Sequence, residues 1–89
     1  MNYYGFGTVV DLEGRTSGNP YYAPCDGYVS VAANGSTSGY FTINNSVSSY
    51  APANVGWCAT SLFVRKGMRI HGAKGANGIF TFTPLVKNN

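Results

Sequence analysis

Short runs of alternating apolar and polar residues, separated by Gly, Asn and Pro, fill most of this 89-residue chain. The clearest runs are 27–33 (GYVSVAA), 39–44 (GYFTIN) and 78–85 (GIFTFTPL). Successive side chains of a β-strand point to opposite faces, so each run predicts a strand with one buried face. No window repeats apolar residues at helical spacing over about three turns, so no substantial helix is expected.

Other parts of the chain also favour extended structure, although their patterns are less regular. The segments expected to be strands are 6–12, 21–23, 46–50, 55–64 and 68–72. The run 55–64 (VGWCATSLFV) is the most apolar and is expected to be a central strand. The expected turns are Cys25-Asp26-Gly27, a hairpin at Asn34-Gly35, Asn44-Asn45 and Arg65-Lys66-Gly67.

Seven or eight short strands in one chain limit the choice of fold class. They predict an all-β domain that covers residues 1–89, built as a small antiparallel β-sandwich of jelly-roll type. A small barrel is the alternative. A domain of this size buries little surface for its length, so it gains stability from a disulfide, a metal or a partner subunit.

Charged residues make up only 10% of the chain, against about a quarter in ordinary soluble domains. The surface is therefore expected to consist largely of Ser, Thr, Asn, Gly and Tyr. Such a surface suits carbohydrate binding, contact with other proteins or a place within a larger assembly. A merely neutral β domain of secreted type is the alternative.

The net charge of +3 permits a nucleic-acid-binding barrel. Its contacts would be Arg65, Lys66, Arg69 and Lys74, but these cations are few and no RNP-like motif accompanies them.

The chain shows no signal peptide and no run of about 18 apolar residues. We therefore expect it to be made in the cytoplasm and to have no membrane partner.

Two cysteines are present, Cys25 and Cys58. A disulfide between them would add a few kcal/mol of stability. Without an export signal, two free thiols are the favoured state.

The residues that carry chemistry in enzymes are few and scattered. His71 is the single histidine, and no ligand spacing joins it to Cys25 or Cys58 in a metal site. Asp11 and Glu13 share a strand face, but a chain this small offers no cleft of the kind that glycosidases build around paired carboxylates. We therefore expect no enzymatic activity, no cofactor and no bound metal.

Exposed aromatic side chains are the best candidates for ligand or partner contacts, because a ring adds apolar area at low entropy cost. The alternative is that these rings pack in subunit interfaces or cover the ends of the sandwich. The expected contact residues are Tyr21, Tyr22, Tyr40, Tyr50 and Arg69.

Three segments carry a resemblance to a known family: 21–29 (YYAPCDGYV), 64–70 (VRKGMRI) and 80–85 (FTFTPL). They resemble the C-terminal heads of bacteriophage head and tail fibres, which are trimeric β-sandwiches similar to the jelly roll of tumour necrosis factor and complement proteins. The resemblance implies a virion structural protein, either a fibre tip or a capsid-decoration module. It also implies a homotrimer that contacts other virion proteins and a host surface glycan. A stand-alone carbohydrate-binding module is the second hypothesis.

Overall fold

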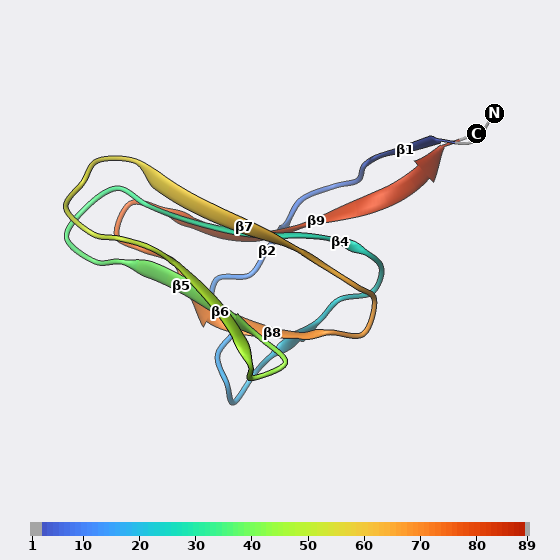
Figure 1. Ribbon diagram of the computed structural model, residues 1–89, viewed down its shortest axis with the longest axis horizontal. Helices are drawn as coiled ribbons and strands as arrows, with labels where there is room; N and C mark the ends of the chain where they lie inside the picture. The colour runs from blue at the N-terminus through green and yellow to red at the C-terminus, as the bar shows by residue number, and fades with distance from the viewer. Residues whose placement is uncertain (1–2, 89) are drawn as a thin grey trace.

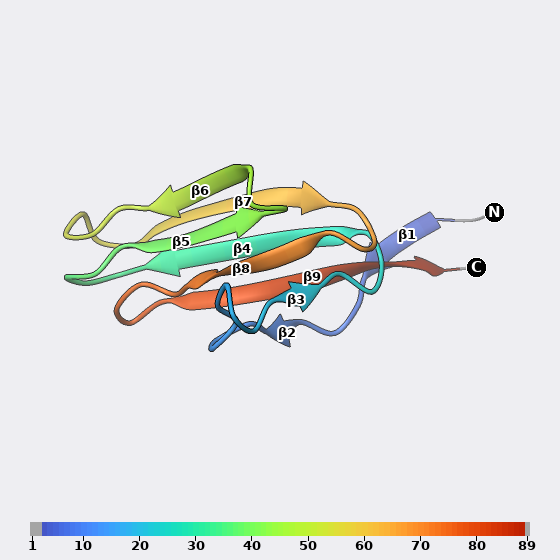
Figure 2. The same cartoon turned by 90° about the horizontal axis from the view of Figure 1, so that it is seen from below.

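The computed structural model describes residues 3–88, which form nine strands in two antiparallel sheets packed face to face (Figures 1 and 2). The five-stranded sheet contains β1 (Tyr3–Phe6), β9 (Ile79–Asn88), β4 (Gly27–Ala33) and β7 (Cys58–Val64) in that order, with β2 (Val10–Asp11) also paired to β9. The four-stranded sheet has the order β3 (Tyr21–Tyr22), β8 (Arg69–Ala73), β5 (Gly39–Ile43) and β6 (Val47–Ala51). The predicted all-β sandwich is confirmed, with more strands than the seven or eight expected.

The strand pairs are nested along the chain. β5 pairs with β6, β4 with β7, β3 with β8, and β2 with β9, all antiparallel. Successive pairs alternate between the two sheets, so the chain resembles one long hairpin rolled over itself. The two arms of this hairpin meet at β5 and β6, and the turn between them uses Asn44 and Asn45 at φ 53° and 57°, as expected for that dipeptide.

Alternating side chains fill the space between the sheets. In β4, Val29 and Val31 are fully buried, whereas Tyr28 on the same strand is exposed. The largest buried side chains are Phe41, Phe80, Phe82, Leu12 and Ile70. The core therefore follows the period of two that the sequence pattern predicts.

Two sequence predictions about local structure are wrong. The segment 6–12 is not one strand, because β1 ends at Phe6 and β2 begins at Val10; between them the Gly7 amide donates to the Pro84 carbonyl. Asn34-Gly35 does not form a hairpin, because β4 and β5 belong to different sheets and neither residue has a positive φ. The connection crosses the sandwich, and local turn chemistry carries no information about that crossing.

The apolar run 55–64 also differs from expectation. Its strand, β7, begins at Cys58 and lies at the edge of the five-stranded sheet, where it pairs with β4. Cys58, Leu62 and Val64 pack toward the core, but Val55 and Trp57 are exposed in the preceding loop. The hydrophobicity of this run therefore comes partly from surface residues.

Gly72 permits the close approach of β8 and β5. It lies opposite Phe41, and a Cβ at this position would collide with the Tyr40 carbonyl and the Phe41 Cα. We expect Gly72→Ala to lower the free energy of unfolding by about 1–3 kcal/mol, measured by urea denaturation. Gly18→Ala is the matched control because no atom lies within 4 Å of a Cβ there, and its effect should stay within about 0.5 kcal/mol. Equal losses in both variants would contradict this explanation.

Candidate functional site

Exposed aromatic rings gather on the outer face of the five-stranded sheet. Phe6, Tyr28 and Phe63 are 69%, 38% and 46% exposed, and we call this surface the aromatic face. The ring centroids of Phe6 and Tyr28 are 6.1 Å apart and those of Tyr28 and Phe63 are 5.5 Å apart, both edge to face. Such pairs add attraction beyond simple burial, so the three rings form one ordered apolar cluster in contact with solvent.

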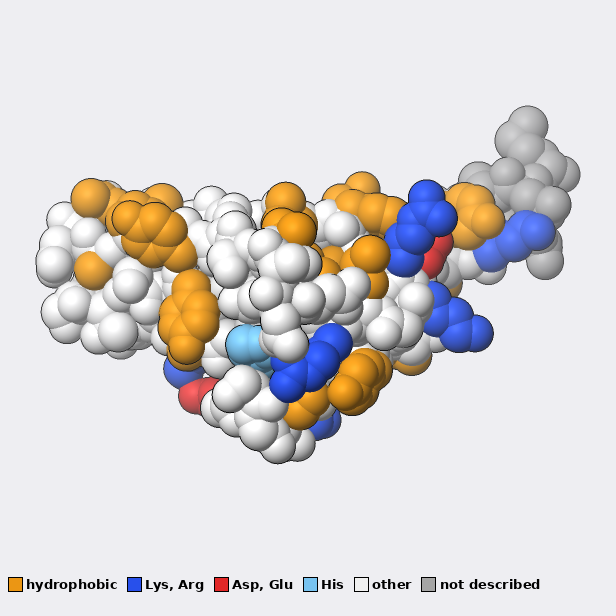
Figure 3. Space-filling model, turned by 60° about the horizontal axis from the view of Figure 1, so that its bottom comes forward, with side chains coloured by type: hydrophobic (Ala, Val, Ile, Leu, Met, Phe, Trp, Pro, Cys, Tyr) orange, Lys and Arg blue, Asp and Glu red, His pale blue; other side chains and the backbone are white. Residues whose placement is uncertain are grey.

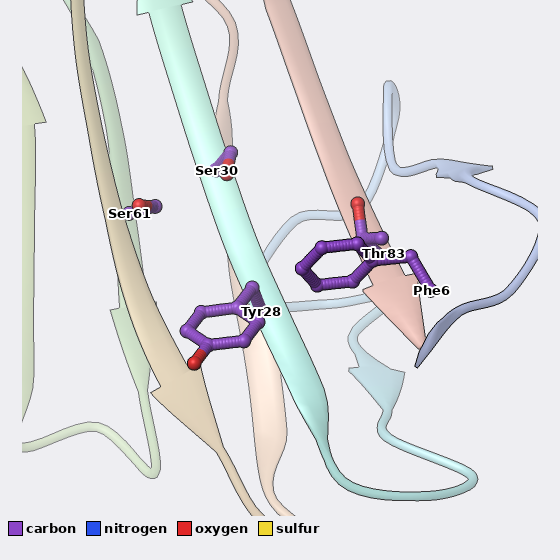
Figure 4. Close-up of a pocket in the computed structure, with 5 residues that line it drawn as sticks. All are labelled: Phe6, Tyr28, Ser30, Ser61 and Thr83. Atoms are coloured by element: carbon purple, nitrogen blue, oxygen red, sulfur yellow. The ribbon is translucent and has the colours of Figure 1, made fainter. Parts of the chain in front are cut away.

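An open hollow lies beside these rings (Figure 4). Its lining consists of Phe6, Tyr28, Ser30, Ser61 and Thr83. The register explains why they meet, since Tyr28 pairs with Thr83 and Ser30 pairs with Ser61. The hollow thus joins two aromatic rings to the hydroxyl groups of two serines and a threonine, and its lining includes no charged side chain.

The aromatic face continues onto a two-stranded ribbon formed by β1 and the end of β9. The ribbon projects beyond the sandwich body, and among residues 3–88 β1 pairs with β9 alone (Figures 1 and 2). Tyr4, Phe6 and Val86 are exposed on it. An isolated two-stranded ribbon is only marginally stable in water, so this extension gains most when another surface covers it.

The predicted contact residues lie mainly on the opposite side of the molecule. Tyr22, Tyr40, Tyr50 and Arg69 share the outer face of the four-stranded sheet, which we call the tyrosine face. Figure 3 shows a pale blue histidine and a blue cation there, with hydrophobic side chains on either side of the pair. The structure therefore brings together four of the five predicted residues from four different strands.

Tyr21 is the exception, because it is partly buried and packs against the core. Its side chain points inward, with its ring centroid 5.6 Å from that of Phe82 and with the Arg15 guanidinium carbon 5.5 Å from its own ring. Burial raises the pKa of the Tyr21 hydroxyl above its ordinary value of 10.0; nearby Cys25 raises this pKa further, and Arg15 opposes the shift. Tyr21 is therefore a packing residue, because the alternation of β3 can present only one of two adjacent tyrosines outward.

The Arg69 side chain is hydrogen-bonded to other residues of the chain. Its guanidinium donates to the Asn45 side-chain carbonyl and to the Ser17 backbone carbonyl, both at 2.6 Å. These bonds tie the 13–20 loop to the β5–β6 turn. Arg69 therefore positions two loops in addition to presenting its charge on the tyrosine face.

The two cysteines and the other side chains that could bind a metal lie apart from one another. Cys25 and Cys58 are free thiols near opposite ends of β4, because Cys58 pairs with Ala33 whereas Cys25 precedes Gly27. This separation is far beyond disulfide reach, which confirms the favoured prediction. Among residues 3–88 no three His, Cys, Asp or Glu side chains group in a way that could hold a metal ion. Within the same range no helix has the length and apolar character needed to cross a membrane.

Sequence reasoning missed Phe63 and Phe6 as surface residues. The alternation from Cys58 to Val64 does carry the signal, since it places Ala59, Ser61 and Phe63 on the face opposite the core. That signal is hidden by the high overall hydrophobicity of the run. A continuous strand over residues 6–12 would have pointed Phe6 toward the core. Because the chain breaks between β1 and β2, Phe6 lies on the outer face instead.

The fold and the two faces together define a small antiparallel β-sandwich with an apolar aromatic surface on one sheet and a polar, tyrosine-bearing surface on the other. Comparison of the chain with protein-family models, with curated proteins and with solved structures gave no match.

Proposed function

We propose that this chain is a structural protein of a bacteriophage virion, a fibre tip or capsid-decoration module, that assembles as a homotrimer and acts by adhesion. The observation that carries the proposal is the aromatic face with its projecting ribbon. Phe6, Tyr28 and Phe63 form an ordered apolar cluster that one chain alone leaves in water. Apolar surface of this kind marks protein contact sites, and we assign the contact to further copies of the same chain.

The chemistry of the aromatic face suits burial between subunits. Rings and small hydroxyl side chains make up the lining of its hollow, and charged residues are absent from it. Interface centres in proteins are likewise enriched in aromatic residues and depleted of charge. A low-charge chain of this length also gains stability by closing one face in a symmetric assembly.

The nested strand order supports the class of protein proposed. Pairing of β2 with β9, β3 with β8, β4 with β7 and β5 with β6 in two packed sheets is the order of a jelly roll. Jelly rolls are common in virion proteins, so the order fits the family resemblance.

The three segments that carry the resemblance meet around Asp26. Its carboxylate accepts a hydrogen bond from the Lys66 amide at 2.9 Å, and its backbone carbonyl accepts one from the Leu85 amide at 2.8 Å. The Gly67 amide also donates to the Ala23 carbonyl. These hydrogen bonds join the three segments at the end of the sandwich from which the projecting ribbon departs.

Sedimentation equilibrium tests the assembly directly. At micromolar concentration the chain should sediment with about three times its 9.4 kDa mass, because the aromatic face is closed by two neighbouring copies. A mass of one chain across the micromolar range would contradict the proposal. Detection of the chain in purified phage particles by mass spectrometry would test its place in the virion.

A stand-alone carbohydrate-binding module is the second candidate. The tyrosine face favours it, because Tyr22, Tyr40 and Tyr50 stand exposed on one sheet. A monomer that binds sugars would support this alternative over the virion protein. Neither candidate assigns the chain a catalytic activity or a cofactor.

A further inference from the structure

We propose that the tyrosine face binds a short oligosaccharide that carries a carboxylate group. The inference deepens the adhesive role in the proposed function and rests on it. It follows from the arrangement of side chains across the four-stranded sheet and from the charge that this arrangement leaves uncompensated.

The outward side chains of this sheet form three parallel rows across the strands. The first row is aromatic, since Tyr40 lies directly opposite Tyr50. The second row is polar, since Thr42 lies between Ser48 and His71. The third row contains Tyr22 opposite Arg69.

The spacing of these rows suits an extended ligand. Outward residues along a strand recur about every 6.6 Å, so the first and third rows stand roughly 13 Å apart. Rings at both ends can pack against the apolar faces of two sugar rings that are separated by a third sugar, which then lies over the polar row. A single monosaccharide would reach only one aromatic row, so the geometry points to an oligosaccharide.

The polar row offers the hydrogen-bonding groups that sugar hydroxyls need. The Thr42 and Ser48 hydroxyl oxygens are 3.1 Å apart, and His71 Nε2 lies 3.2 Å from the Asn45 side-chain carbonyl. Each hydroxyl both donates and accepts, so this pair still has capacity for a ligand. Ordered polar groups flanked by exposed rings are the composition of adaptable binding surfaces.

The charge of the face specifies an acidic ligand. Both side-chain hydrogen bonds of the Arg69 guanidinium go to neutral oxygens, those of Asn45 and Ser17. The ion pair found within residues 3–88 lies elsewhere, between Lys74 and Glu13. The positive charge of Arg69 therefore has no carboxylate partner in the described part of the chain, and its remaining N–H donors match a carboxylate supplied by the ligand.

The test uses two matched pairs of probes with the full-length chain: sialyllactose with lactose, and trigalacturonic acid with its methyl ester. Isothermal titration calorimetry at low salt should show binding to at least one of the two acidic probes. Its neutral counterpart should bind at least about tenfold more weakly. Added salt should lower the affinity for the acidic probe. Tyr40→Ala and Tyr22→Ala should each reduce the affinity by about tenfold or more. Trp57→Ala is the matched control, because this ring is 67% exposed in a loop outside the face, and it should bind like the unaltered chain.

Several results would overturn the inference. They are equal affinity for acidic and neutral members, absence of binding to both acidic probes, or loss of binding in Trp57→Ala but not in the tyrosine variants. Sedimentation of the same samples separates this inference from the assembly proposal. A trimer without acidic-sugar binding refutes only the ligand, whereas a monomer that binds the acidic sugar refutes only the assembly.

Discussion

Phe63→Asp is expected to convert the proposed homotrimer into monomers with an unchanged fold. Phe63 lies on the aromatic face, edge to face with Tyr28, and self-association would bury its ring. An unpaired carboxylate in that position would be removed from water at a cost of several kcal/mol in each interface. Since every 1.4 kcal/mol changes an equilibrium constant about tenfold, the association should weaken by several orders of magnitude.

The measurement is sedimentation equilibrium at micromolar concentration, with circular dichroism to show that the strands remain. Tyr50→Asp is the matched control, because it introduces the same charge at an exposed ring on the other sheet. This control should sediment like the unaltered chain. If both variants stay associated, or both dissociate, the aromatic face is not the contact surface.

Phe82→Ala should give the largest loss of stability among single substitutions in the core. Phe82 is fully buried in β9, and its ring packs against Tyr21. Truncating a buried Phe costs about 3–5 kcal/mol through lost burial and the cavity left behind. A small domain loses about 4 °C or more of Tm per kcal/mol, so Tm should fall by roughly 12 °C or more.

Differential scanning calorimetry at one fixed protein concentration checks this expectation, because association also raises Tm. Val55→Ala is the comparison variant, since Val55 is 62% exposed in the loop before β7. Its effect should remain within about 0.5 kcal/mol. Similar Tm values for the two variants would mean that the two sheets are not held together by the packing described above.

The sequence predicts the features that depend on local alternation and misses those that depend on distant partners. Val29, Val31 and Tyr28 occupy the faces that the pattern of residues 27–33 predicts, because one strand decides all three. Local turn chemistry predicts a hairpin at Asn34-Gly35, and this prediction is wrong because β4 and β5 belong to different sheets.

The candidate faces illustrate the same limit. Tyr22, Tyr40 and Tyr50 were predicted as exposed contacts, but their common face follows from pairings between strands that the sequence pattern does not reveal. Arg69 donates to the carbonyl of Ser17, which is 52 residues away in the chain. The aromatic face combines Phe6, Tyr28 and Phe63 from three strands, and only the register across the sheet brings them into contact.

The position of β9 has a consequence for how the molecule is made. This strand lies between β1 and β4, and it supplies Phe80 and Phe82 to the core, so neither the five-stranded sheet nor the core can form before residues 79–88 have been made. Slow folding is expected, as is typical of chains whose pairings join distant segments. The projecting ribbon has the same requirement, because it is built from β1 and β9 together and neither strand can form it alone.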